Sequence, residues 1–273
     1  MMGYNCISMN YEEISPYPPI DRKPFILHVP HSSTYISEEY RRQLCLDDEN
    51  LNGELLVMTD WFTDELFDRA GTYGATLFIN RVSRLVMDPE RFPDDQNEPM
   101  SAKGMGVIYT RTSQGGELRT ELSVSNRQTI MNDLYWPYSK AFHNLVTQQL
   151  NQFDRCMIID GHSFASTALP YEDESLIRPD ICFGYESPHE PSGLIDALEQ
   201  CCRQEGLISA RNQPFSGAYV PVDYFKKDER VTSVMIEVNR SLYMDETTGT
   251  KSAGYDQLRV VVEKLMELAC SHQ

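Results

Sequence analysis

The sequence predicts a single α/β domain, built on a largely parallel sheet with helices on both faces. Short apolar runs of strand length alternate with longer amphipathic segments along the 273 residues. The short runs are almost continuously apolar, which is typical of strands buried on both sides. Hydrophobic residues make up 41% of the chain and aromatic residues 10%, the composition of a globular protein with a sizeable core.

The apolar runs are expected to form strands at residues 25–29, 75–79, 157–159, 181–183 and 234–238. Helices are expected at residues 51–70, 127–152, 194–205 and 255–269. In the last of these, apolar side chains recur with the helical period, at Leu258, Val261, Val262, Leu265 and Leu268. That pattern predicts a helix with one buried face.

Residues 1–23 are polar and contain three prolines, so we expect an N-terminal arm there. Residues 24–273 are then expected to form the single domain. Two stretches, 92–106 and 165–179, are rich in proline, glycine, serine and acidic residues. We interpret them as loops over the active face of the sheet rather than as linkers between domains.

The net charge of −17 disfavours nucleic acid and anionic membranes as partners. It leaves room for a small anionic substrate, provided that basic residues gather in one cleft. The chain starts without the basic and apolar regions of a signal peptide, and its seven cysteines show no CxxC spacing. We therefore expect reduced thiols and a cytoplasmic location, while the oligomeric state stays open.

Three ionisable residues lie where an α/β sheet usually places its active site, at the carboxyl ends of strands. His31 follows the first predicted strand, His162 follows the third, and Glu237 lies inside the last. Two imidazoles and one carboxylate bind zinc well and leave a fourth position open for water. Each histidine alone would more often be a structural residue. A carboxylate inside an apolar strand, however, is costly unless it is paired or functional.

The residue pattern leaves the carboxylate ligand of this metal site open among Asp60, Asp64 and Glu65, which also suit a solvated helix face. A basic cluster follows the second predicted strand, with arginines at Arg81, Arg84 and Arg91. The planar guanidinium group suits bidentate capture of a substrate carboxylate. Internal pairing, for example with Asp88, is the alternative.

At these residues the sequence resembles the N-formylglutamate amidohydrolase family. The matching stretches are Val-Pro-His-Ser at 29–32, Thr-Asp-Trp at 59–61, Ser-Arg-Leu-Val-Met-Asp at 83–88, Asp-Gly-His-Ser at 160–163, Asn-Gln-Pro-Phe-Ser-Gly at 212–217 and Ile-Glu-Val-Asn-Arg-Ser-Leu-Tyr-Met-Asp-Glu at 236–246. They occur in the family's order and extend the resemblance over residues 25–268. The resemblance implies a mixed sheet flanked by helices, in a zinc-exopeptidase-like fold similar to that of the zinc carboxypeptidases.

The resemblance also implies a function and roles for particular residues. It implies a zinc ion held by His31, Asp60 and His162, with Glu237 as the general base. Arg84 and Arg91 become candidates for binding the substrate carboxylate, and Asn212 a further substrate-binding candidate. The implied reaction is hydrolysis of N-formyl-L-glutamate to formate and glutamate. Manganese, iron or cobalt would also suit this set of ligands.

Two departures from the family pattern fall where substrate recognition is expected. The family's Asp-Leu-Asn-Arg reads Asp88-Pro89-Glu90-Arg91 here, which adds an acid beside the anion site, and its Lys-Gly-Gly region reads Ser216-Gly217-Ala218. A zinc hydrolase of another N-acyl amino acid or of a peptide C-terminus therefore stays an alternative, as does a non-catalytic binding protein. A serine hydrolase is disfavoured because no GxSxG elbow is present.

Overall fold

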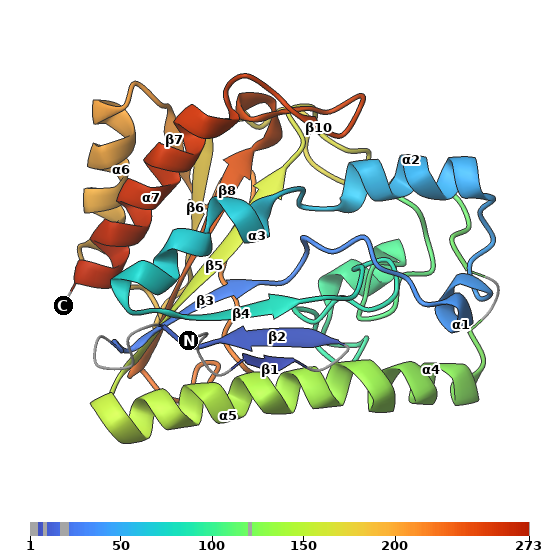
Figure 1. The fold of residues 1–273 in the computed structure, drawn as a ribbon. Coiled ribbons are helices and arrows are strands. Elements are labelled where there is room, and N and C mark those ends of the chain that lie inside the picture. The colour runs from blue at the N-terminus through green and yellow to red at the C-terminus, as the bar shows by residue number, and fades with distance from the viewer. Residues whose placement is uncertain (1–4, 8–9, 17–21, 120–121, 273) are drawn as a thin grey trace.

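The computed structural model describes residues 5–7, 10–16, 22–119 and 122–272. Its centre is an eight-stranded sheet in the order β1-β2-β4-β3-β5-β8-β6-β7 (Figure 1). The strands are β1 (Asn5–Ile7), β2 (Tyr11–Ile14), β3 (Phe25–Val29), β4 (Thr76–Asn80), β5 (Cys156–Phe164), β6 (Ile181–Gly184), β7 (Ser209–Arg211) and β8 (Val231–Asn239). Strands β4, β3, β5 and β8 run parallel to one another, whereas β2 and β6 pair antiparallel with β4 and β8. The predicted α/β class with a mixed, mostly parallel sheet is confirmed.

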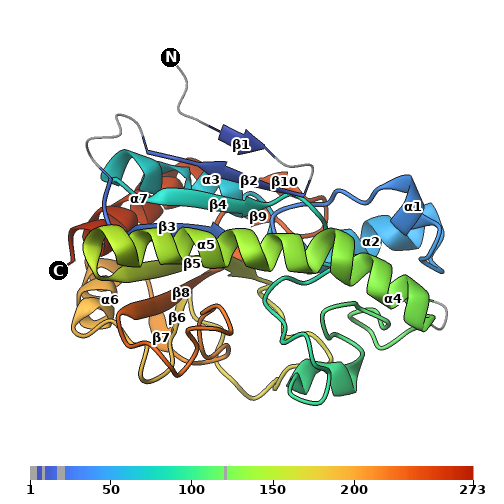
Figure 2. The ribbon, with the colours of Figure 1, turned by 90° about the horizontal axis from the view of Figure 1, so that it is seen from below.

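Helices cover both faces of the sheet (Figure 2). Alternate strand residues point to opposite sides, and both sets are apolar, so each face packs against helices. On one face, Ile26 and Ile158 pack with side chains of α5 (Trp136–Phe153). On the other face, Leu27 and Ile159 belong to a larger apolar core. That core is completed by α3 (Thr63–Leu66), α6 (Leu194–Gln204) and α7 (Tyr255–Ser271).

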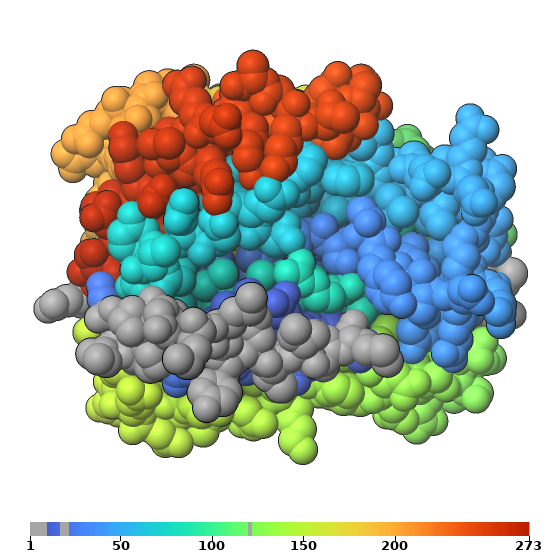
Figure 3. All heavy atoms as spheres, in the orientation of Figure 1, coloured from blue at the N-terminus to red at the C-terminus, as the bar shows by residue number. Residues whose placement is uncertain are grey.

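The C-terminal helix α7 packs against the segment that follows α3. Figure 3 shows the two segments in contact on the surface, and an ion pair of 2.8 Å joins Arg259 to Asp68. Asp68 begins the 3₁₀ helix η2 (Asp68–Tyr73). Within the described ranges, no helix has the length and apolar character needed to cross a bilayer.

The remaining elements surround the carboxyl ends of the central strands (Figure 1). They are α1 (Glu38–Arg41), α2 (Asp48–Met58), η3 (Pro99–Lys103), α4 (Val124–Ile130), the π turn η4 (Met131–Tyr135), η5 (Arg240–Leu242), β9 (Met244–Asp245) and β10 (Thr250–Lys251). Two smaller apolar clusters, one containing Val86 and the other Leu85, hold this region together. The loops beyond the strand ends are thus anchored by cores of their own.

All five predicted strands are present, and the predicted helices at 194–205 and 255–269 correspond to α6 and α7. The prediction of one helix over 51–70 is wrong. Helix α2 ends at Met58, Thr59 is extended, and Phe62 adopts a left-handed conformation with φ of 62°. The break occurs because Asp60 N donates a hydrogen bond of 3.0 Å to His31 O, which ties the chain to the end of β3.

The segment expected to be an N-terminal arm contributes β1 and β2 to the sheet. Strand β2 pairs with β4 from Tyr11 opposite Asn80 to Ile14 opposite Leu77. Strands β1, β2, β7, β9 and β10 have four residues or fewer. Unlike β6, which also has four residues, they contain no continuous apolar run, so the sequence does not predict them as strands.

Gly184, the last residue of β6, allows a loop to pass close to the sheet. A Cβ atom at this position would clash with the backbone oxygen of Gly217 and with Met235. We expect Gly184→Ala to lower the free energy of unfolding by about 1–3 kcal/mol, because backbone cannot yield as a flexible side chain does. Denaturation by urea measures this change.

Gly53 provides the matched control for this substitution. It lies within α2, and a Cβ atom there would meet nothing within 4 Å. Gly53→Ala is therefore expected to raise stability by roughly 0.5–1 kcal/mol. Equal stability of Gly184→Ala and the wild type would contradict the close approach of the Gly217 loop to β6.

Candidate metal centre and active site

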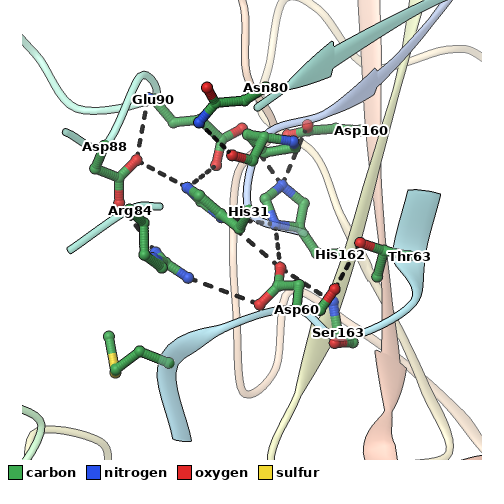
Figure 4. A network of polar contacts seen from close by, with 12 residues as sticks. His31, Asp60, Thr63, Asn80, Arg84, Asp88, Glu90, Asp160, His162 and Ser163 are labelled. Atoms are coloured by element: carbon green, nitrogen blue, oxygen red, sulfur yellow. Dashed lines mark hydrogen bonds and ion pairs between the residues drawn. The ribbon is translucent and has the colours of Figure 1, made fainter. Parts of the chain in front are cut away.

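The two predicted histidines lie side by side at the carboxyl ends of two neighbouring parallel strands (Figure 4). His31 follows β3 by two residues, and His162 lies within β5. Both side chains are buried, and their Nδ1 atoms are 3.3 Å apart. The loop that carries His31 is held by Asn80, whose Nδ2 donates to Pro30 O at 2.8 Å.

Asp60 is the acidic residue that completes this pair. The break after α2 brings its Oδ2 to 3.1 Å from His162 Nδ1 and 3.7 Å from His31 Nδ1. A tetrahedral zinc ion with bonds of about 2.0–2.1 Å separates its ligand atoms by about 3.3–3.4 Å. The three side chains present one nitrogen or oxygen each at nearly these separations, so they fit a zinc ion. Asp64 and Glu65, the other acids of this stretch, form ion pairs with Arg81 and Lys251 instead.

Further carboxylates hold the opposite edges of the two imidazole rings. His31 Nε2 hydrogen-bonds to Asp88 Oδ1 at 2.9 Å, and His162 Nε2 lies 3.1 Å from Asp160 Oδ1. Metal-binding histidines commonly direct their second nitrogen to a carboxylate, which fixes the tautomer and the ring orientation. Asp60 is oriented in a similar way, because Arg240 Nη2 donates to its Oδ1 at 3.0 Å.

Glu90 approaches the same ring edges from the loop after β4. Its carboxylate oxygens are 3.5 Å from His31 Nε2 and 3.3 Å from His162 Nε2. Glu90 therefore forms a second group of possible metal ligands with the two histidines, and a third with His28 and Asp160. The sequence analysis predicted Glu90 beside an anion site but did not predict its contact with the histidines. Its departure from the family's asparagine was the available signal.

The charges of this cluster favour a bound cation. Burial opposes the ionisation of Asp60, but hydrogen bonds from His162 and His31 outweigh burial and lower its pKa. Burial likewise disfavours a charged His162, yet the charges of Glu90 and Asp160 raise its pKa well above the ordinary value.

With neutral histidines and all five carboxylates ionised, the cluster carries an excess of two negative charges. Its carboxylates are Asp60, Asp88, Glu90, Asp160 and Glu237, and its guanidinium groups are Arg84, Arg91 and Arg240. One divalent cation would neutralise this excess. The histidine protons serve the same purpose when no metal is bound.

Glu237 lies on β8 directly beside His162 of β5 in the sheet register. It is buried, and its Oε2 atom has no hydrogen-bond partner among the described residues. Burial raises the pKa of Glu237 to about 7, against the opposing charge of His162. A carboxylate with this pKa is suited to accept and return a proton near neutral pH.

The structure separates the three arginines of the predicted basic cluster. Arg81 forms ion pairs with Glu12 and Asp64 instead of contacting the histidines or their carboxylate partners. Arg84 donates to Asp88 at 3.0 Å and to the Tyr109 hydroxyl at 3.2 Å. These contacts give Arg84 the internal pairing that the sequence left as an alternative.

Arg91 and Asn212 differ in whether their side chains already make hydrogen bonds within the protein. In the described part of the chain the Arg91 guanidinium makes no hydrogen bond, and Nε lies 3.5 Å from Asp88 Oδ2. Arg91 borders a cavity of about 210 Å³ that also touches Glu90 and Asp160. Asn212 has a φ of 50°, and its Oδ1 accepts from the backbone nitrogens of Tyr185 and Gly217. Its side-chain oxygen therefore shapes the loop that borders the cavity.

Comparisons with known proteins agree with the fold. The model of the N-formylglutamate amidohydrolase family matches residues 23–244. An N-formylglutamate deformylase of Pseudomonas putida is 26% identical over 232 residues, which cover 83% of this chain and 84% of the relative. One of Pseudomonas aeruginosa is 24% identical over 253 residues, with 90% and 92% covered.

The crystal structure of N-formylglutamate amidohydrolase from Ralstonia eutropha JMP134 has the same fold, with a TM-score of 0.83 at 23% identity and coverage of 96% and 98%. Together these findings define a hydrolase that acts on linear amide C–N bonds. The chain belongs to the N-formylglutamate amidohydrolase family, which confirms the resemblance found in the sequence.

Proposed function

We propose that this chain is a zinc-dependent hydrolase of N-acyl amino acids, with N-formyl-L-glutamate as the first substrate to test. The observation that carries the proposal is the triangle of His31 Nδ1, His162 Nδ1 and Asp60 Oδ2, with edges of 3.1–3.7 Å. The names of the related proteins support the substrate class.

In this proposal His31, Asp60 and His162 hold the metal. When bound, zinc supplies Lewis-acid polarisation of the scissile carbonyl and lowers the pKa of water. Glu237 takes a proton from the attacking water and later delivers it to the departing amine nitrogen. The burial of Glu237 supports this role because it raises the pKa of the carboxyl to about 7.

Substrate orientation falls mainly to Arg91 in this proposal. Its guanidinium borders the cavity and is not used by the hydrogen bonds of the described residues, so it is available for a substrate carboxylate. Arg84 orients Asp88, which in turn contacts His31. Asn212 acts through the loop that its side-chain oxygen holds in place. Arg81 takes no part in substrate binding, because its guanidinium group is paired with Glu12 and Asp64.

The test is metal analysis of the purified protein, together with N-formyl-L-glutamate hydrolysis before and after chelation. We expect about one zinc ion per chain and a loss of activity on chelation that added zinc restores. Activity that survives complete removal of metal would refute the zinc-dependent mechanism. Metal binding without hydrolysis of any N-acyl amino acid would refute the proposed reaction.

A second candidate substrate is an N-acyl amino acid other than N-formyl-L-glutamate. The observation that favours it is Glu90, which places a carboxylate beside Arg91 in the same cavity.

A further inference from the structure

The cavity that Arg91 borders contains an unusual set of charges. Of its charged lining residues, Glu90, Asp160 and Glu186 are acidic and Arg91 is basic. Aromatic side chains, among them Phe92 and Tyr135, form much of the remaining wall. A ligand in this space therefore meets carboxylates as well as the guanidinium group.

Two of these carboxylates already have partners. Asp160 accepts from His28 Nδ1 at 2.8 Å and from Tyr219 N at 3.1 Å. Glu186 forms an ion pair with Lys226 at a more exposed position. Neither carboxylate is left for a ligand.

Glu90 is different, because its Oε1 atom is buried and makes no hydrogen bond with any described residue. Glu90 Oε1 lies 3.3 Å from His162 Nε2 and 3.6 Å from His28 Nδ1. Asp160 Oδ1 is closer to both nitrogens, at 3.1 and 2.8 Å. His28 Nδ1 is hydrogen-bonded to Asp160, whereas His162 Nε2 has no hydrogen-bond partner among the described residues. The Glu90 carboxylate thus contacts the histidines without a hydrogen bond and keeps its capacity to accept one from a ligand in the cavity.

Glu90 and Arg91 are adjacent and face the same cavity, so one ligand could meet both. Arg91 suits a carboxylate, whereas an ionised glutamate only accepts hydrogen bonds and repels a second carboxylate.

We propose that Glu90 is a specificity-determining residue that selects N-acyl amino acids whose side chain ends in N–H donors. Arg91 binds the α-carboxylate of the substrate, and Glu90 accepts a hydrogen bond from the end of its side chain. Substrates with a side-chain carboxylate are disfavoured by repulsion. This inference rests on the proposed function and narrows its substrate class.

The test compares kcat/KM of the zinc-loaded full chain for N-formyl-L-glutamine, N-formyl-L-lysine and N-formyl-L-glutamate. The wild type is expected to prefer the first two over the glutamate derivative by at least about tenfold. Glu90→Asn is expected to shift this ratio toward glutamate by at least about tenfold, and Glu90→Gln to shift it in the same direction. A ratio that is unchanged in both variants would overturn the proposal.

Glu205→Gln is the matched control, because it removes one negative charge at an ion pair with Lys264 on the surface. It should leave the substrate ratio unchanged. An equal shift in this variant would assign the effect to net charge and overturn the role of Glu90.

Binding by calorimetry separates failure of this inference from failure of the proposed function. If no compound is hydrolysed, the proposed reaction fails, while the Kd values of the same compounds still report on Glu90. A Kd preference for the N–H-bearing side chains that is lost in Glu90→Asn would then support the inference. Hydrolysis with a preference for glutamate in the wild type would overturn the inference and leave the proposed function intact.

Discussion

Glu237→Gln is expected to lower kcat by roughly 10²–10⁴ while the bound zinc is retained. The amide is close in size to the carboxylate but cannot accept the proton of the attacking water. Glu237 is not part of the Asp60 and histidine triangle, although it lies beside His162 in the register of β5 and β8. Single-turnover kinetics together with metal analysis measure the two effects separately.

Glu54→Gln is the matched control for the loss of a buried carboxylate. The two residues are equally buried, since Glu54 is 7% exposed and Glu237 is 8% exposed. Glu54, however, accepts hydrogen bonds from Ser113 N and Oγ and does not contact the metal-binding side chains. Its substitution should leave kcat nearly unchanged. Full activity of Glu237→Gln would remove Glu237 from the role of base.

The pH profile provides a second readout for Glu237. Burial raises the pKa of its carboxyl to about 7, and a nearby cation would lower that pKa. Protonation removes the base, so kcat/KM of the wild type should fall as the pH falls through this pKa. The acid limb due to Glu237 should be absent from the residual activity of Glu237→Gln.

Asp60→Asn is expected to weaken zinc binding by more than the roughly 10–100-fold that loss of an outer partner costs. Asp60 Oδ2 lies within 3.7 Å of both His31 Nδ1 and His162 Nδ1, and no other carboxylate of the described residues forms an ion pair with either nitrogen. An asparagine keeps the shape but loses the charge that balances the metal. Zinc titration against a competing chelator measures the affinity.

Glu90→Gln makes the same chemical change on the opposite edge of the rings. If Asp60 is the metal ligand, this variant should lose no more than about 10–100-fold in zinc affinity. His31→Ala removes a ligand common to both edges and should lose the metal in either case. Zinc that is lost in Glu90→Gln and retained in Asp60→Asn would move the site to the group of His31, Glu90 and His162.

The strands and the outer helices could be predicted because local periodicity reflects burial. Strand β3 lies at the predicted residues, and α6 and α7 begin where predicted. The mixed character of the sheet was implied only by the resemblance, because the direction of β6 depends on pairing with β8. Helix α2 could not be bounded from its sequence, since a backbone contact with His31 ends it.

The candidate site divides in the same way. The residue types and their positions at or within predicted strands by themselves determined His31, His162 and Glu237 as candidates, and the resemblance selected Asp60. Only the tertiary structure decided that Arg81 lies outside the cluster, that Arg91 faces the cavity and that Glu90 contacts both histidines. Side chains far apart in the sequence meet through strand register and loop anchoring, whereas burial preference is a local property of the chain. For this reason the fold class could be predicted from the sequence, whereas the arrangement of charges could not.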